Sequence, residues 1–148
     1  LEGVVDVIPG YSGGHKNNPT YKEICTGMTG HAEVAQITFD PRIITFDDLL
    51  NMFWKSHDPT TRNRQGNDIG TQYRSAIFYH NNEQKTIAEK SKKKVDNSNI
   101  FSNPIVTEIT KLEKFWVAED YHNNYYNNNM NQPYCKFIIK PKLDKLFK

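Results

Sequence analysis

Residues 32–54 read AEVAQITFDPRIITFDDLLNMFW, and they contain the two patterns that decide the fold class. Residues 32–39 alternate along the chain, which predicts a strand with at least one well-buried face. Thr45 is predicted to cap a helix, because Asp48 follows it three residues later. Apolar side chains then recur at helical spacing and predict an amphipathic helix: Phe46, Leu49, Leu50, Phe53 and Trp54.

On both sides of this stretch, shorter patterns predict further elements. They are a strand over 4–8 ended by Pro9-Gly10, a short helix capped by Asn18 and closed at Gly27, a strand over 72–79, a surface helix over 83–95 and a strand over 105–110. Residues 57–70 form a long polar loop, and loops of that length are often functional. After Trp116 the chain is rich in asparagine, which predicts a long C-terminal coil before a last helical turn over 141–148.

The mixture of strands and helices predicts an α+β fold. We expect a two-layer sandwich with a mixed or antiparallel sheet and a ferredoxin-like core. No internal repeat or linker divides the 148 residues, so they are predicted to form one domain.

Composition argues against several classes of function. The mean hydropathy is −0.76 and no apolar run approaches the length of a membrane span, so we expect no membrane partner. The net charge of +2 does not favour nucleic acid, and the lysine-rich run at 90–94 is predicted to be a solvated helix face. Two widely separated cysteines, Cys25 and Cys135, favour a reducing compartment, and we expect the cytoplasm. The histidines and cysteines lack the spacing of metal ligands, so no metal site is predicted.

Several polar side chains stand where secondary structure does not require them. Glu33 begins an otherwise apolar strand, Asp68 and Tyr73 lie near the mouth of another, and residues 118–122 read AEDYH. Burial raises the pKa of a carboxyl group, so a buried glutamate can hold a proton near neutral pH. Neighbouring tyrosine hydroxyls could then donate hydrogen bonds to a substrate oxygen.

Five segments together resemble the motif series of the methionine sulfoxide reductase A family, in the family's order. They are GYSGG at 10–14, NPTYKEICTG at 18–27, TGHAEV at 29–34, FWKSHDPTTRNRQGNDIGTQYRSAIFY at 53–79 and AEDYHNNY at 118–125. The similarity extends from about Gly3 to Cys135. Each motif is modest alone, and the specificity comes from five in series with compatible spacing.

The resemblance implies a reaction. A cysteine thiolate attacks the sulfur of methionine S-sulfoxide, the oxygen leaves as water after protonation, and a sulfenic acid forms on the enzyme. A second cysteine converts the sulfenic acid to a disulfide, which thioredoxin reduces. The implied partners are therefore methionine sulfoxide, free or in proteins, and thioredoxin. No cofactor is implied, and we expect a monomer.

The resemblance also implies catalytic residues. Glu33 matches the family's acid, which protonates the leaving oxygen. Tyr21 and Tyr73 match the hydroxyls that bind this oxygen, and Cys135 matches the resolving cysteine. Alternatively, the two tyrosines could be aromatic residues of the core, and Cys135 could be a thiol that takes no part in the reaction.

Two further positions match substrate-binding residues of the family. Asp68 corresponds to the aspartate that holds the substrate's backbone amide side or a catalytic water, although it could also be only a turn residue. Tyr134 lies where the family has a pocket-lining tyrosine. His31 and His57 are read as structural, and Cys25 as a buried, inert thiol.

The family's nucleophile does not occur in this sequence. It stands in a glycine–cysteine–phenylalanine–tryptophan run that precedes the position matching Leu1. We therefore expect an N-terminally incomplete domain, with an attacking cysteine or selenocysteine upstream, and no reductase activity from the 148 residues alone. The alternative function is a non-catalytic relative that binds methionine or methionine sulfoxide side chains without reducing them.

Overall fold

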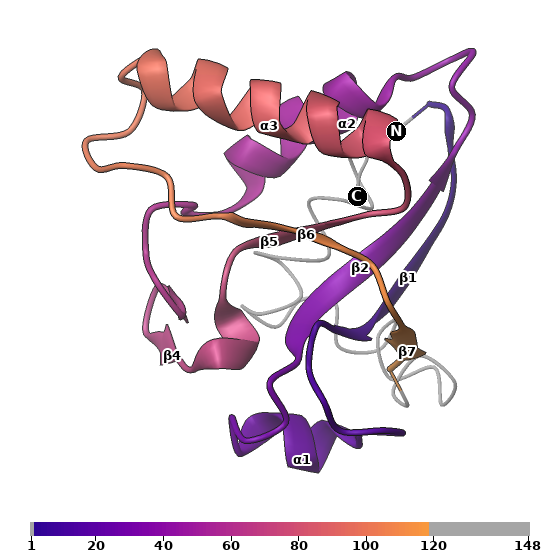
Figure 1. Cartoon of the computed structure of the whole chain (residues 1–148), viewed down its shortest axis with the longest axis vertical. Coiled ribbons are helices and arrows are strands. Elements are labelled where there is room, and N and C mark those ends of the chain that lie inside the picture. The colour runs from indigo at the N-terminus through magenta and orange to yellow at the C-terminus, as the bar shows by residue number, and fades with distance from the viewer. Residues whose placement is uncertain (1, 119–148) are drawn as a thin grey trace.

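The structure is a computed structural model that describes residues 2–118, and it has an α+β fold (Figure 1). Its elements are β1 Val4–Ser12, α1 Tyr21–Cys25, β2 Ala32–Phe39, α2 Phe46–Ser56, β3 Arg64–Gln65, β4 Asp68–Ile69, the 3₁₀ helix η1 Thr71–Tyr73, β5 Ala76–Tyr79, α3 Asn82–Asn97, β6 Glu108–Lys111 and β7 Phe115–Val117. The predicted coil, the predicted last helical turn, His122, Tyr134 and Cys135 lie outside the described residues.

The described strands form three separate sheets, and the largest is antiparallel, which is one of the two arrangements that the sequence predicted. β1 pairs antiparallel with β2 on one side and β7 on the other, so the order is β2-β1-β7. β5 and β6 pair in parallel, and β3 and β4 form a short antiparallel hairpin. The ferredoxin-like arrangement of the core stays a prediction.

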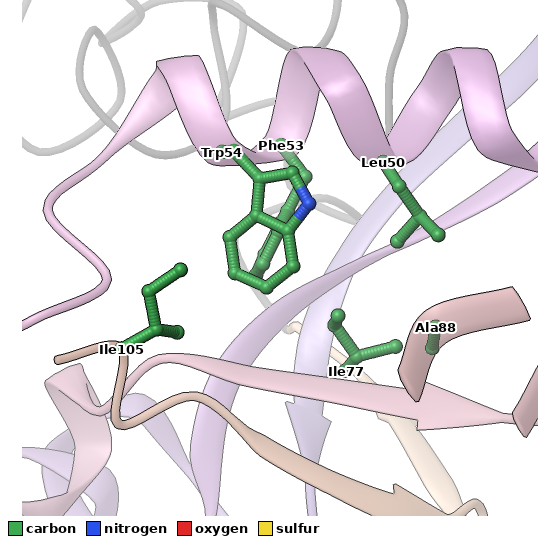
Figure 2. Packing of buried hydrophobic residues seen from close by; sticks show 6 residues of the cluster. All are labelled: Leu50, Phe53, Trp54, Ile77, Ala88 and Ile105. Atoms are coloured by element: carbon green, nitrogen blue, oxygen red, sulfur yellow. The ribbon is translucent and has the colours of Figure 1, made fainter. Parts of the chain in front are cut away.

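The apolar face of helix α2 contributes side chains to two of the hydrophobic clusters in the core. Leu50, Phe53 and Trp54 pack against Ile77 of β5 and Ala88 of α3 (Figure 2). A smaller cluster forms where Leu49 and Ile44 meet side chains of β1 and β2. Burying one such leucine or phenylalanine stabilises the fold by about 1.5–3 kcal/mol. The predicted strand over 32–39 and the predicted helix after Thr45 are both confirmed.

Strand β1 continues through Pro9 and Gly10, so the prediction that it ends there is wrong. The Pro9 carbonyl accepts a hydrogen bond from the Ala118 N–H at 2.9 Å, just beyond the end of the β7 ladder. In an antiparallel strand the N–H and C=O of one residue face the same neighbour. The nitrogen of Pro9, which carries no hydrogen, therefore faces the β7 side, so the pairing of β1 with β2 is intact and the bond forgone is the one to Ala118, where β7 ends.

Other boundaries also differ from the predictions. α1 is capped by Thr20 rather than Asn18, although it closes at Gly27 with φ +73 as expected. The predicted strand over 72–79 is wrong in its first half, where η1 forms, and β6 starts later than Ile105. β7 and the β3–β4 hairpin were not predicted.

Candidate active site

Glu33 lies near the beginning of β2, directly opposite Tyr11 of β1. The residue is half-buried, and its carboxylate oxygen Oε2 is fully buried. His31, two residues before it, is buried and holds the preceding loop through both ring nitrogens. Its Nδ1 accepts from the Gly14 N–H at 3.0 Å, so Nε2 carries the proton and donates to the Lys16 carbonyl at 2.7 Å. The prediction that His31 is structural agrees with these contacts.

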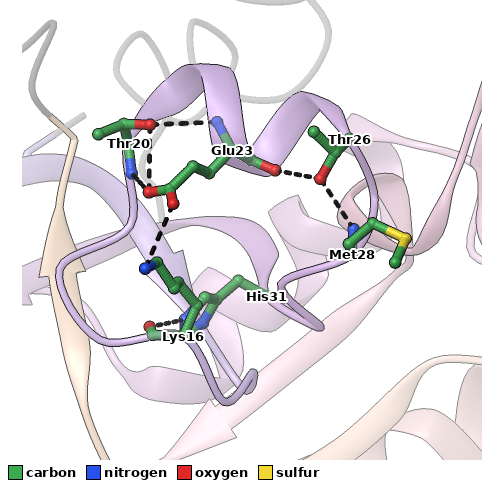
Figure 3. Close-up of polar contacts among 6 residues, drawn as sticks. All are labelled: Lys16, Thr20, Glu23, Thr26, Met28 and His31. Atoms are coloured by element: carbon green, nitrogen blue, oxygen red, sulfur yellow. Dashed lines mark hydrogen bonds and ion pairs between the residues drawn. The ribbon is translucent and has the colours of Figure 1, made fainter.

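Tyr21 is presented by the short helix α1, which strong local contacts stabilise. Thr20 and Glu23 form a reciprocal capping box, with hydrogen bonds of 3.1 and 3.0 Å, and Lys16 pairs with Glu23 at 3.3 Å (Figure 3). Tyr21 and Cys25 are one helical turn apart, and their side chains are hydrogen-bonded to each other. The helix therefore fixes the Tyr21 hydroxyl beside a thiol.

Tyr73 is the last residue of η1, and side chains tie this turn to α1. The Thr71 hydroxyl donates to the Gly27 carbonyl at 3.2 Å, and the Gln72 amide reaches the Cys25 carbonyl at 3.5 Å. Gly70 precedes the turn with a φ of +151°, a backbone conformation that residues other than glycine rarely adopt. These contacts explain why a 3₁₀ turn forms where alternation predicted a strand.

The charge of Glu33 contributes to the raised pKa values of both Tyr21 and Tyr73, so the three side chains share one electrostatic environment. The hydrogen bond to Cys25 is the largest cause that raises the pKa of Tyr21 above its usual value, and partial burial and the charge of Glu33 add to it. Burial is the main cause that raises the pKa of Tyr73, followed by the charge of Glu33. Both hydroxyls therefore stay protonated and able to donate hydrogen bonds at any pH where a carboxylate acts.

A cavity of about 120 Å³ extends from Glu33 and Tyr73 between β2, α2 and β5. Apolar side chains make much of its wall: Ile37, Phe39, Phe46, Leu50, Phe53 and Ile77. His57 also lines it, and its ring joins a buried polar chain. His57 Nδ1 lies 2.8 Å from the Phe53 carbonyl, and Nε2 lies 2.7 Å from the Ser75 hydroxyl. These partners account for His57 as a structural residue, as expected.

The structure brings three of the six predicted site residues together and places a fourth nearby. Asp68 lies in β4 with its side chain exposed, and its charge contributes to the raised pKa of Tyr73. The expectation for Cys25 is wrong, because this thiol is exposed and contacts Tyr21 rather than being buried. The spacing of Tyr21 and Cys25 on a helix could have indicated this contact from the sequence. Gln72 is the other site residue that sequence reasoning missed.

Within residues 2–118, no group of three or more histidine, cysteine, aspartate or glutamate side chains is arranged to hold a metal ion. None of the helices described is both long enough and apolar enough to cross a membrane.

Comparison with known proteins decides the family. The model of the peptide methionine sulfoxide reductase family matches residues 1–148. This chain belongs to that family. Peptide methionine sulfoxide reductase MsrA of Sulfolobus acidocaldarius is 55% identical over 148 residues, which are 100% of this chain and 83% of the relative. The protein of the same name from Leptospira borgpetersenii is 53% identical with the same coverage.

Solved structures of family members share the fold. The reduced form of Mxr1 from Saccharomyces cerevisiae superposes with a TM-score of 0.82 at 35% identity, covering 93% of this chain and 78% of that one. Methionine sulfoxide reductase A of Corynebacterium diphtheriae gives a TM-score of 0.72 at 40% identity, with 86% and 65% covered. The chain is thus a member of an oxidoreductase family, and the Glu33–Tyr21–Tyr73 cluster lies within the matched region.

Proposed function

We propose that this protein reduces methionine S-sulfoxide, free or in proteins, at the cluster of Glu33, Tyr21 and Tyr73. The convergence of one buried carboxylate oxygen with two protonated phenol hydroxyls carries this proposal. Reduction of a sulfoxide requires a proton donor for a poor leaving oxygen and hydrogen bonds to that oxygen as charge develops. Glu33 supplies the proton, and the two hydroxyls supply the hydrogen bonds.

The chemical steps balance with one attacking thiol. Its thiolate attacks the sulfoxide sulfur, one proton from Glu33 and a second proton from solvent reach the oxygen, the S–O bond breaks and water leaves, so that a sulfur–sulfonium bond remains. Water then attacks the enzyme sulfur, methionine leaves with the bonding electron pair, and a sulfenic acid forms. A second thiol displaces water from the sulfenic acid to give a disulfide.

The attacking thiol is supplied by a segment that is not among the 148 residues. The cavity supports this proposal, because β2 and β5 border it and each has a single hydrogen-bonded neighbour among residues 2–118. An edge strand is a template for another strand. A further strand between β2 and β5 would cover the apolar wall and end beside Glu33 and Tyr73, where the thiol is needed.

The remaining roles follow the family resemblance. Asp68, on the hairpin beside Tyr73, holds the backbone amide side of the substrate or a catalytic water, and Tyr134 lines the pocket. Cys135 resolves the sulfenic acid, and thioredoxin reduces the disulfide by thiol exchange. We propose the cytoplasm as the location, since two widely separated cysteines favour a reducing compartment. We also propose that the protein is a monomer.

An epimer-resolved reductase assay tests this function. The complete protein, with the upstream thiol, should reduce the S epimer of N-acetyl methionine sulfoxide with thioredoxin and leave the R epimer unchanged. The 148 residues alone should show no turnover. Binding of the sulfoxide by the complete protein without reduction would instead support a non-catalytic relative.

A further inference from the structure

Three large apolar side chains lie exposed on α1, on the turn that follows it and on β4. Among the described residues, Met28 is 77% exposed, Ile69 70% and Tyr21 47%. We call these three residues the apolar rim. Singly exposed apolar residues are ordinary, but a group beside a binding site marks an interaction surface.

Hydrogen bonds between α1 and η1 bring the members of the rim together. The bond from the Thr71 hydroxyl to the Gly27 carbonyl joins the residue before Met28 to the second residue after Ile69. The Gln72 amide reaches the carbonyl of Cys25, whose side chain contacts Tyr21. α1, β4 and η1 occupy the same end of the molecule (Figure 1). The two hydrogen bonds that hold α1 against η1 therefore position the apolar rim together with the two tyrosines of the site.

Local hydrogen bonds hold the two segments that present Met28 and Ile69 in place. The Met28 N–H donates to the Thr26 hydroxyl at 3.1 Å, and that hydroxyl donates to the Glu23 carbonyl at 2.6 Å. The Met28 side chain extends from this turn away from the Lys16–Glu23 ion pair (Figure 3). On the other segment, the Gly70 N–H donates to the Asn63 carbonyl at 2.9 Å across the hairpin. Rigid presentation lowers the entropic cost of binding.

We propose that the apolar rim binds apolar side chains next to an oxidised methionine in an extended polypeptide. The inference rests on the proposed function and specifies its substrate class. Two observations favour this occupant over a second copy of the chain. The rim is continuous with the site through Tyr21, which belongs to both, so a polypeptide inserted at Glu33 must pass over it. Methionine is unbranched and adapts to partners of different shape, as a surface that accepts many sequences requires.

Neutral polar substitutions at Met28 and Ile69 test the proposal in the complete protein. Each position should contribute about a fivefold gain in kcat/KM for a peptide with leucine on both sides of methionine S-sulfoxide, from partial burial of one apolar side chain. The double variant Met28→Gln/Ile69→Gln should therefore lose about 25-fold in kcat/KM with this peptide if the two contributions are independent. It should retain its rate with N-acetyl methionine sulfoxide, which has no flanking side chains.

Val5→Gln/Ile100→Gln is the matched control, since these residues are 71% and 73% exposed and lie outside the rim. It should leave both substrates unaffected. The proposal is overturned if the rim variant keeps its preference for leucine over serine flanks, or if the control loses that preference equally. Failure of the unsubstituted protein to reduce N-acetyl methionine sulfoxide would overturn the proposed function and the rim with it, whereas normal reduction without flank preference would count against the rim alone.

Discussion

In the polar chain behind the site, replacing Ser75 with alanine should destabilise the fold more than replacing Thr107 with valine. The Phe53 carbonyl can only accept, so in a neutral His57 ring Nδ1 donates to it at 2.8 Å and Nε2 is left as an acceptor. The Ser75 hydroxyl donates to Nε2 at 2.7 Å and accepts from the Thr107 hydroxyl, also at 2.7 Å. Ser75 therefore lies in the middle of this chain of hydrogen bonds, and Thr107 lies at its end and donates to Ser75.

The magnitudes follow from these directions. Ser75→Ala removes two hydrogen bonds worth about 1 kcal/mol each and leaves one ring nitrogen and one buried hydroxyl without that partner, so the loss should be about 3 kcal/mol. Thr107→Val keeps the shape and removes one donor, for a loss of about 1 kcal/mol. Urea denaturation with unchanged m values measures both free energies of unfolding. Equal losses, or a larger loss for Thr107→Val, would refute the assigned directions.

Three further predictions concern the site and its support. In the complete protein, Cys135→Ser should allow one turnover but stop recycling by thioredoxin, and normal steady-state turnover would show that another thiol, such as Cys25, resolves the intermediate. His31→Ala should lower the free energy of unfolding by about 2 kcal/mol, because two hydrogen bonds of about 1 kcal/mol each, to the Gly14 N–H and the Lys16 carbonyl, are lost; an unchanged urea midpoint would contradict this. Absorbance titration should show Tyr21 and Tyr73 ionising above the usual pKa near 10. Since the folded pKa values are raised, their stabilising contribution should be complete below about pH 10 and decline as pH rises through the folded values.

The sequence predicted the elements whose side-chain pattern is set by the core. The strand over 32–39 and the helix after Thr45 agree with the structure, and the helix does so because its apolar residues Leu49, Leu50, Phe53 and Trp54 are all buried in the core. β1 was cut short because Pro9 normally ends a strand, and its tolerance here depends on where a distant strand, β7, stops. That information is tertiary and is absent from the local pattern.

The sequence predicted which residues belong to the site, but it did not predict how they are arranged in space. Glu33, Tyr21 and Tyr73 were identified through family motifs, since alternation alone gives no reason to place α1 beside η1. Tyr73 was expected in a strand, and its 3₁₀ turn depends on hydrogen bonds from Thr71 and Gln72 to α1. The exposure of Cys25 likewise depends on how α1 sits on the molecule, which a five-residue helix does not encode.

The central claim is that Glu33 protonates the sulfoxide oxygen between the hydroxyls of Tyr21 and Tyr73. The most direct measurement is the single-turnover rate of methionine S-sulfoxide reduction by the complete protein carrying Glu33→Gln. Glu89→Gln, on the exposed face of α3, is the control and should leave the rate unchanged. Loss of a general acid predicts a rate about 10²–10⁴-fold lower for Glu33→Gln, with the fold intact. A single-turnover rate equal to that of the unsubstituted protein would contradict the account, because the proton would then come from another group.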